Sequence, residues 1–238
     1  MASSAALPSL LIFGPQTELP SQEVLAGLRR ELTQNPSLSG LAAAVKDLPR
    51  FWHSLTAFDP DLCQVPGEKY LGAFQRWISD GGAFPHHLGG NPNVYALPVT
   101  VVLQITQYVR YIGELGFQDP HRHVLDGLRD GGAQGFCVGL LSALTVSTSQ
   151  TEADLAGVAS VGMRLAICIG AYVDKDGRFG QLFDEKACVA LRWRSDHAGA
   201  KDDVIALVRT FQDVGLHQLR FQAATLKLRV TGIHIEYQ

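Results

Sequence analysis

The five residues Gly135-Phe136-Cys137-Val138-Gly139 constrain the fold of this chain more than any other stretch. They form G-x-C-x-G, the thiol version of the G-x-S-x-G nucleophile elbow, in which a sharp turn joins a strand to a helix. Gly135 and Gly139 are needed there because neighbouring backbone approaches closely and a Cβ would clash. A helix N-terminus favours the thiolate of Cys137, and the N–H of Val138 would point into an oxyanion hole. The pattern therefore predicts an α/β fold that carries a nucleophile elbow.

The alternative interpretation of Cys137 is an inert core thiol, because free cysteine is among the most buried residue types. The sequence after the elbow favours the first interpretation: an apolar helix is expected over residues 140–147, where Ser142 and Ala143 allow close packing. The sequence before the elbow is less typical, since RDGGAQ (129–134) is not apolar and predicts at most a short buried strand. Both interpretations of Cys137 therefore stay open from the residues alone.

An apolar run near the N-terminus, Leu10–Gly14, predicts a second buried strand that ends in the turn Gly14-Pro15. The loop after this strand contains Gln16. Its backbone N–H is a candidate second donor to the oxyanion hole. The alternative interpretation of the same loop is an ordinary turn at the end of a strand.

Helical periodicity accounts for much of the remaining sequence up to residue 178. Ser21 can cap the first helix, and Thr151 to Asp154 can form a capping box for the last one. Segments 59–93 and 120–130 are expected to be irregular or surface connections, with short helical pieces in the first of them. Helices are expected over residues 21–34, over 41–58 with a break near Pro49, over 98–115, and from 151 to about 173.

The character of the sequence changes after a boundary expected between residues 174 and 180. Residues 187–193 alternate like a strand, 202–213 have a helical pattern, and 217–236 hold two β-rich runs. The order strand–helix–strand–strand indicates a small α+β unit. The predicted domains are residues 1–178 and residues 179–238.

Composition excludes several classes of protein. The 238 residues are 46% hydrophobic and 18% charged, which is typical of a globular protein. A net charge of −3 without a long basic run argues against nucleic acid and anionic membranes as partners. No signal peptide or membrane span is predicted. The four cysteines lie far apart without a C-x-x-C pair, so we expect no metal site and a reduced, cytoplasmic environment.

Four stretches together resemble one family, the starter-unit acyl-carrier-protein transacylase domain of fungal non-reducing iterative polyketide synthases. The resemblance runs over most of the chain, and it implies an acyltransferase-like fold. In that fold an α/β-hydrolase-like core carries the elbow, and a ferredoxin-like subdomain is inserted into the core. Residues 179–238 match part of this subdomain. The four stretches are LLIFGPQT (10–17), NPNVYALPVTVVLQITQYVRYI (91–112), QGFCVGLLSALTVS (134–147) and VGMRLAICIGAYVD (161–174).

The resemblance also implies a reaction. The cysteine of the family takes an acyl group from a coenzyme A thioester or a fatty acid synthase, and passes it to the phosphopantetheine arm of an acyl carrier protein. Cys137 matches this nucleophile, and Gln16 matches the residue whose backbone helps to bind the oxyanion. Arg164 matches an arginine that binds the substrate carboxylate in malonyl-type relatives. Starter units usually lack a carboxylate, so a structural salt bridge is the alternative role of Arg164.

Coenzyme A enters this reaction only as the leaving group of the donor, so no bound cofactor is implied. The expected partners are the acyl carrier protein and the other domains of a polyketide synthase. In this family the catalytic histidine comes after the ferredoxin-like subdomain, at a position that this sequence does not contain. We therefore expect slow acylation at Cys137 and poor turnover. The alternatives are a truncated, non-catalytic module that binds the carrier protein, and a cysteine hydrolase, for which the sequence offers no histidine and acid at convincing spacing.

Overall fold

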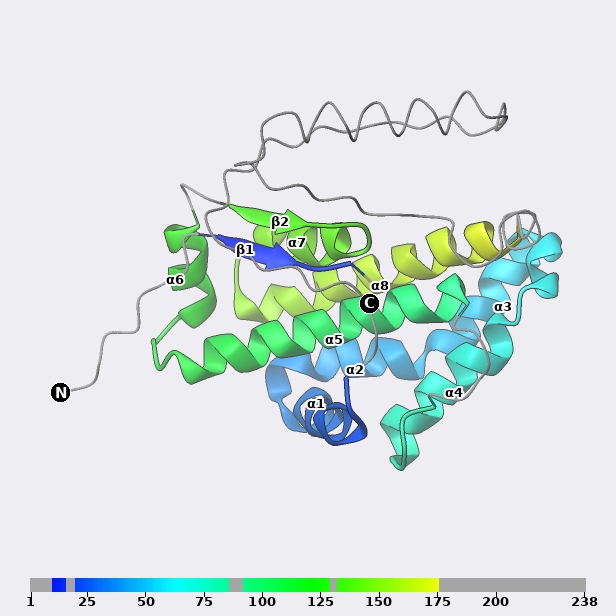
Figure 1. The fold of residues 1–238 in the computed structure, drawn as a ribbon, viewed down its shortest axis with the longest axis horizontal. Helices are drawn as coiled ribbons and strands as arrows, with labels where there is room; N and C mark the ends of the chain where they lie inside the picture. Colours follow the sequence, from blue (N-terminus) through cyan, green and yellow to red (C-terminus); the bar gives the residue numbers. More distant parts are fainter. Residues whose placement is uncertain (1–9, 16–19, 86–91, 129–131, 176–238) are drawn as a thin grey trace, which may run out of the picture. The chain divides into compact units, whose positions relative to one another are not determined.

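The computed structural model describes residues 10–15, 20–85, 92–128 and 132–175 (Figure 1). The chain divides into two compact units, Met1–Leu182 and Phe183–Gln238, and all the described residues belong to the first. The predicted boundary after residue 178 and the ferredoxin-like nature of residues 179–238 lie outside the described residues. Both stay predictions.

The described part is mainly helical and holds a two-stranded parallel sheet. Strand β1 (Leu11–Phe13) pairs with strand β2 (Ala133–Gly135), with Leu11 opposite Ala133 and Phe13 opposite Gly135. Parallel strands need a long crossover connection, and here the crossover contains helices. Parallel strands combined with helices are compatible with the predicted α/β class.

Two long helices form the centre of the described part. Figure 1 shows α5 and α8 side by side, with β1, β2 and α7 on one side of them and α1, α2 and α4 on the other. Across the described residues the helices are α1 (Gln22–Gln34), η1 (Pro36–Leu38), α2 (Ser39–Lys46), α3 (Leu48–Phe58), η2 (Pro60–Gln64), α4 (Gly67–Asp80), α5 (Asn93–Glu114), α6 (Pro120–Gly127), α7 (Gly139–Thr148) and α8 (Glu152–Lys175).

Local sequence signals start three of these helices at the expected places. The hydroxyl of Ser21 accepts a hydrogen bond from the N–H of Val24 at 3.4 Å. Thr151 and Asp154 form a reciprocal capping box: Asp154 N–H donates to Thr151 Oγ1 at 3.2 Å, and Thr151 N–H donates to Asp154 Oδ2 at 3.1 Å. Pro49 lies in the first turn of α3, so the predicted break falls between α2 and α3. These expectations are confirmed.

The expectation that 59–93 and 120–130 are mainly irregular is wrong. Helix α4 is 14 residues long, and its buried side chains recur every three or four residues: Tyr70, Leu71, Phe74, Trp77 and Ile78. Helix α6 begins at Pro120, and the Asp119 carboxylate before it accepts a hydrogen bond from Arg122 N–H at 3.3 Å. In both segments the burial of one apolar face outweighs the Gly, Pro and polar content that favours loops.

Helix α5 starts five residues earlier than expected and continues through Pro98. Proline lacks an N–H and usually ends a helix. Here the first turn is capped from another helix, because the Asp174 carboxylate of α8 accepts hydrogen bonds from the N–H groups of Asn93 at 3.0 Å and Val94 at 2.8 Å. Side chains on nearly all sides of α5 are buried. Tertiary contacts therefore hold a helix that the local sequence would interrupt.

Helix α8 is long and apolar enough, by length and composition, to cross a membrane. This is weak evidence, because the core helix of a soluble protein passes the same test. One face of α8 is buried against α2, α5 and α7, with Leu155, Ala159, Met163 and Ile167 pointing into the core. Helix α8 therefore has one face in the core of the described part and one exposed face, and 39% of its apolar window is buried.

Candidate active site at the elbow

The segment around Cys137 is a sharp strand-to-helix turn. Strand β2 ends at Gly135, and α7 begins at Gly139. Cys137 has φ +56°, and it is the one non-glycine residue with positive φ within the described ranges. A left-handed conformation of this kind costs an L-residue about 1–3 kcal/mol, and such strain is concentrated at functional sites. Val138, at φ −59° and ψ −26°, then leads into the helix.

The two glycines of the motif lie where backbone segments come close together. A Cβ on Gly135 would lie 2.2 Å from the Cα and N of Leu140, and a Cβ on Gly139 would lie 2.3 Å from the carbonyl oxygen of Phe13. The N–H of Phe136 donates a hydrogen bond to the same Phe13 oxygen at 2.9 Å. The elbow therefore packs directly against the end of β1, and a side chain at either glycine position would force these segments apart.

Cys137 is exposed and has a free thiol. This position disagrees with the interpretation of Cys137 as inert core filler. The backbone hydrogen bonds of the turn join Gly139 N–H to Phe136 O at 3.0 Å and Leu140 N–H to Cys137 O at 3.1 Å. Among the described residues, the N–H of Val138 has no backbone acceptor. It is thus an open donor at the start of a helix, where an oxyanion is favoured.

Gln16 lies outside the described residues, so its predicted part in the oxyanion hole stays a prediction. The structure describes the residues just before it. The carbonyl oxygen of Gly14 accepts a hydrogen bond from the side-chain amide of Gln104 in α5 at 2.9 Å. No motif marks Gln104 in the sequence; its one local signal is that it is a polar residue between the apolar residues Leu103 and Ile105.

Arg164 of α8 contacts α3 and Asp47, the residue between α2 and α3. Its guanidinium lies 3.9 Å from the Asp47 carboxylate and 5.8 Å from the ring centre of Phe51. Gly162, two residues earlier, faces α7, since a Cβ there would lie 3.0 Å from Thr145 Oγ1. Two residues in an α-helix are about 200° apart, so Arg164 points away from α7. These contacts support the salt-bridge alternative, and a role in substrate binding stays a prediction.

Three of the eight histidines lie in the described residues, and two of them have partners elsewhere. His121 is buried: its Nδ1 lies 2.8 Å from the Tyr108 hydroxyl, and its Nε2 lies 3.0 Å from the Ser149 carbonyl oxygen. The ring of His123 stacks on Phe117 at 4.8 Å. His53 is exposed on α3. His86, His87, His197, His217 and His234 lie outside the described residues.

Burial shifts the pKa values of two other titratable groups. Burial raises the pKa of the Cys168 thiol on α8, which makes that cysteine a poorer nucleophile at neutral pH. Burial also raises the pKa of Tyr108. Within the described ranges, no three His, Cys, Asp or Glu side chains converge in a way that could hold a metal ion.

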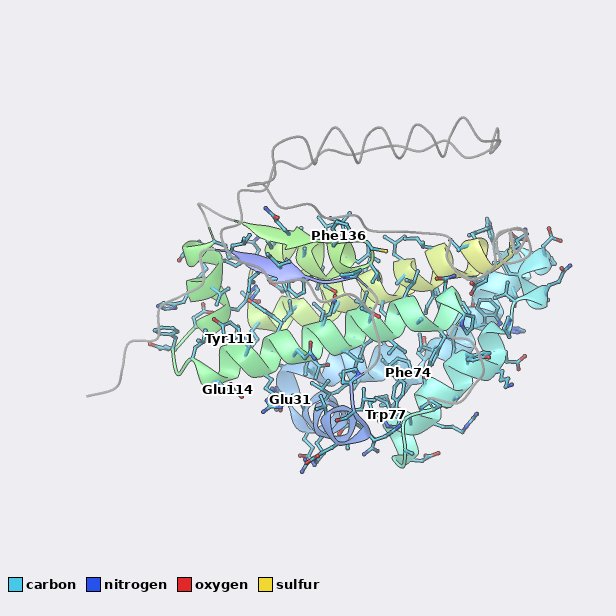
Figure 2. The ribbon with its side chains drawn as sticks, in the orientation of Figure 1. Glu31, Phe74, Trp77, Tyr111, Glu114 and Phe136 are labelled. Atoms are coloured by element: carbon cyan, nitrogen blue, oxygen red, sulfur yellow. The ribbon has the colours of Figure 1, made fainter. Side chains whose placement is uncertain are left out.

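Apolar side chains surround the exposed cysteine. We define the elbow surface as Phe136, Leu140 and Leu144; all three are exposed, and Phe136 retains 59% of its surface. Figure 2 shows Phe136 beside β2 and α7, on the side of α5 opposite to Phe74 and Trp77. Helix α8 adds an exposed row at four-residue spacing, formed by Val161, Leu165 and Ile169. Exposed apolar side chains that lie together often mark a binding surface.

Comparison with known proteins agrees with this geometry. A family model described as "Starter unit:ACP transacylase in aflatoxin biosynthesis" matches residues 62–200, which include the elbow. The 5-methylorsellinic acid synthase of Aspergillus terreus is 36% identical over 197 residues, covering 82% of this chain and 7% of that protein. The methylphloroacetophenone synthase of Cladonia uncialis is 35% identical over 221 residues, covering 88% and 9%. A non-reducing polyketide synthase of Penicillium shearii is 37% identical over 205 residues, covering 86% and 9%.

The chain therefore spans less than a tenth of the length of these three curated relatives. The family match extends over more than half of the chain and over the strand, turn and helix that present Cys137. On this evidence, the chain belongs to the starter unit:ACP transacylase family.

Proposed function

We propose that this chain transfers a starter acyl group from a coenzyme A or fatty acid synthase thioester, through a thioester on Cys137, to an acyl carrier protein in polyketide biosynthesis. The observation that carries the proposal is the exposed thiol of Cys137, held at positive φ between a parallel strand and a helix N-terminus. Membership of the transacylase family supports the reaction class. The inferred partners are the carrier protein and the remaining domains of a polyketide synthase, in the cytoplasm.

The chemical step is an exchange of thioesters. The Cys137 thiolate attacks the carbonyl carbon of the donor, a carbon–sulfur bond forms, and the carbonyl oxygen becomes an oxyanion. The bond to coenzyme A then breaks, and the departing thiolate takes up the proton that Cys137 gave up. The phosphopantetheine thiol of the carrier protein then attacks the Cys137 thioester in the same way, takes the acyl group and releases the Cys137 thiol. The open N–H of Val138, together with the backbone N–H proposed for Gln16, would bind the oxyanion in both steps.

The surroundings of Cys137 suit an acyl chain without a charge. Phe136 precedes the cysteine, Leu140 lies one turn after it, and both are apolar and exposed. Arg164, the cation that could bind a substrate carboxylate, contacts Asp47 instead. We infer that the donor is an uncharged starter unit, whose apolar chain would cover part of the elbow surface.

Turnover depends on a base for the thiol. Within the described residues, no hydrogen bond joins a histidine side chain to Cys137, and His121 and His123 bond to other groups. Loss of general acid–base help typically costs roughly 10²–10⁴ in rate. We therefore propose that residues 1–238 acylate at Cys137 slowly and load the carrier protein inefficiently. The same family membership leads us to infer an α/β-hydrolase-like core with a ferredoxin-like subdomain over residues 179–238.

The test is transfer to a carrier protein. The chain is mixed with a panel of acyl-coenzyme A thioesters and phosphopantetheinylated carrier protein, and acylation of the carrier protein is followed by mass spectrometry. Cys137→Ala is expected to abolish transfer, while Cys63→Ala, which removes another exposed free thiol, is expected to leave it unchanged. Transfer that continues in Cys137→Ala would contradict the proposal.

A second candidate function is a module that binds the carrier protein without catalysis. The observation that favours it is the exposed apolar area on α7 and α8, which is typical of interaction surfaces. Under this alternative Cys137→Ala still binds the carrier protein with unchanged affinity, and the unsubstituted chain forms no acyl adduct. A cysteine hydrolase would instead release free acid from the thioester without any carrier protein.

A further inference from the structure

We propose that Gln104 is a positioning residue for the elbow: its side-chain amide holds the carbonyl of Gly14 and thereby fixes the end of β1 against the turn that carries Cys137. The inference rests on the proposed acyl transfer, because it concerns the geometry in which that reaction binds its oxyanion. Gln104 does not touch the substrate in this account. It acts through the backbone of β1 and of the elbow.

The hydrogen bond joins two segments that are far apart in the sequence. Nε2 of Gln104, in the middle of α5, donates to the Gly14 oxygen at 2.9 Å. Oε1 of the same amide is buried and has no hydrogen-bond partner among the described residues. Rotating the amide by 180° would place Oε1 against the Gly14 oxygen, so two acceptors would face each other. The Gly14 carbonyl therefore sets the orientation of the amide.

The end of β1 is also held by the elbow. The Phe13 oxygen accepts the N–H of Phe136 at 2.9 Å. The oxygens of Phe13 and Gly14 lie 2.3 and 2.4 Å from the place where a Cβ on Gly139 would be. The end of β1 thus contacts the Gln104 amide through the Gly14 oxygen and the first turn of α7 through the oxygens of both Phe13 and Gly14. Val138, whose open N–H is the proposed oxyanion donor, lies between Phe136 and Gly139.

The expected size of the effect follows from how strictly an oxyanion hole depends on distance. Donors act at about 2.7–3.1 Å from the oxyanion, and removal of one donor costs about 10²–10³ in rate. A misplacement of about 1 Å costs about 10². Loss of the Gln104 hydrogen bond leaves the Val138 N–H in place but less well fixed. We therefore expect acylation of Cys137 to slow by about ten- to a hundredfold.

Two reactions of the same thiol separate positioning from general damage. Gln104→Leu removes the donor at similar size, and Gln107→Leu, three residues along α5 and exposed, is the matched control. Acylation by an acyl-coenzyme A forms an oxyanion, whereas alkylation by iodoacetamide displaces iodide at a saturated carbon and forms none. Gln104→Leu is expected to slow acylation but to change alkylation of Cys137 by less than about twofold. Unchanged acylation, or an equal loss in both reactions, would overturn the inference.

A second variant tests the donor itself. Gln104→Glu offers a hydrogen-bond donor only when its carboxyl is protonated, and burial favours that neutral form. Its acylation rate relative to the unsubstituted chain is expected to rise as the pH is lowered from about 8 to about 5.5, while the relative rate of Gln104→Leu stays flat. A flat ratio for Gln104→Glu would count against the hydrogen bond as the cause.

Failure of the inference and failure of the proposed function give different results. If the unsubstituted chain is acylated and Gln104→Leu is acylated at the same rate, the positioning role alone is refuted. If the unsubstituted chain shows no acylation at all, the proposed function fails, and the positioning role is tested by hydrogen exchange. Exchange at the Phe136 N–H, which donates to Phe13, is expected to speed up in Gln104→Leu. Unchanged protection there would overturn the inference independently of activity.

Discussion

Replacing Gly135 by alanine tests whether the elbow geometry depends on the absence of a side chain. An added Cβ would lie 2.2 Å from the Cα and N of Leu140 and 2.3 Å from the carbonyl carbon of Gly139. All three atoms belong to the backbone, so no side-chain rotation can relieve the contact. Gly135 is the last residue of β2, and the atoms that it would meet belong to the first turn of α7.

The size of the effect follows from the displacement that the added carbon requires. Ordinary contacts begin near 3.4 Å, so β2 and α7 would have to separate by about 1 Å. Overpacking of this kind costs about 1–3 kcal/mol when side chains can adjust. Here a shift of backbone would also weaken the hydrogen bond from Phe136 to Phe13, worth about 1 kcal/mol. We expect Gly135→Ala to lower the free energy of unfolding by about 3 kcal/mol or more, and Tm by about 6–12 °C.

The assay is urea unfolding followed by tryptophan fluorescence, with Gly157→Ala as the matched control. Gly157 lies within α8, and a Cβ there would meet nothing within 4 Å. Gly157→Ala is therefore expected to stabilise the protein by about 0.4–1 kcal/mol, since alanine restricts the unfolded chain and favours helix. A Gly135→Ala variant within about 0.5 kcal/mol of the original chain would refute the close approach of β2 to α7.

Two further predictions concern the C-terminal end of α8. Asp174→Ala removes the acceptor for two backbone N–H groups at the start of α5. It should lower the free energy of unfolding, measured in urea, by about 1–2 kcal/mol. A change below about 0.3 kcal/mol would show that the cap contributes little. Hydrogen bonds from Lys175 hold the pKa of Asp59 below its ordinary value, and Asp59 and Asp61 raise the pKa of Lys175. A lowered carboxyl pKa stabilises the fold above the unfolded pKa, and the gain is lost as pH falls through the folded pKa. The urea midpoint of Lys175→Met should therefore lie slightly below that of the original chain near neutral pH, and the two midpoints should become equal below about pH 3. A difference that stays constant down to that pH would contradict the ion pair.

The features that the sequence analysis located correctly all depend on residues close together in the chain. The motif around Cys137 requires glycines on both sides of one turn, and the structure shows backbone close to both of them. The capping box from Thr151 to Asp154 spans four residues. The apolar run near the N-terminus is a strand at Leu11–Phe13, as predicted, although Phe13 is its one buried residue and Ile12 is exposed. Short-range rules of sterics and hydrogen bonding decide such features, so a single sequence is enough to find them.

Most of the features that were missed depend on contacts between distant segments. Helix α6, which Asp119 caps locally, is the exception. Helix α5 begins at Asn93 because the carboxylate of Asp174, 81 residues later, caps it. The residues near Asn93 do not indicate that contact. Helix α4 forms because its aromatic face packs against other rings. The ring centres of Phe74 and Tyr95 are 6.2 Å apart, and those of Trp77 and Phe84 are 4.8 Å apart. The hydrogen bond between Gln104 and Gly14 crosses 90 residues. Only the packed structure shows which polar residue of an apolar helix meets which carbonyl.

The position of the acyl group after incubation with an acyl-coenzyme A thioester decides whether Cys137 is the nucleophile. Intact-mass analysis followed by peptide mapping identifies the cysteine that carries the adduct. We expect one acyl group per chain, on Cys137. It should be absent in Cys137→Ala and unaffected by Cys168→Ala, because burial raises the pKa of the Cys168 thiol. An adduct on Cys63 or Cys168, or a folded chain that takes up no acyl group from any thioester, would contradict the assignment of Cys137 as the nucleophile.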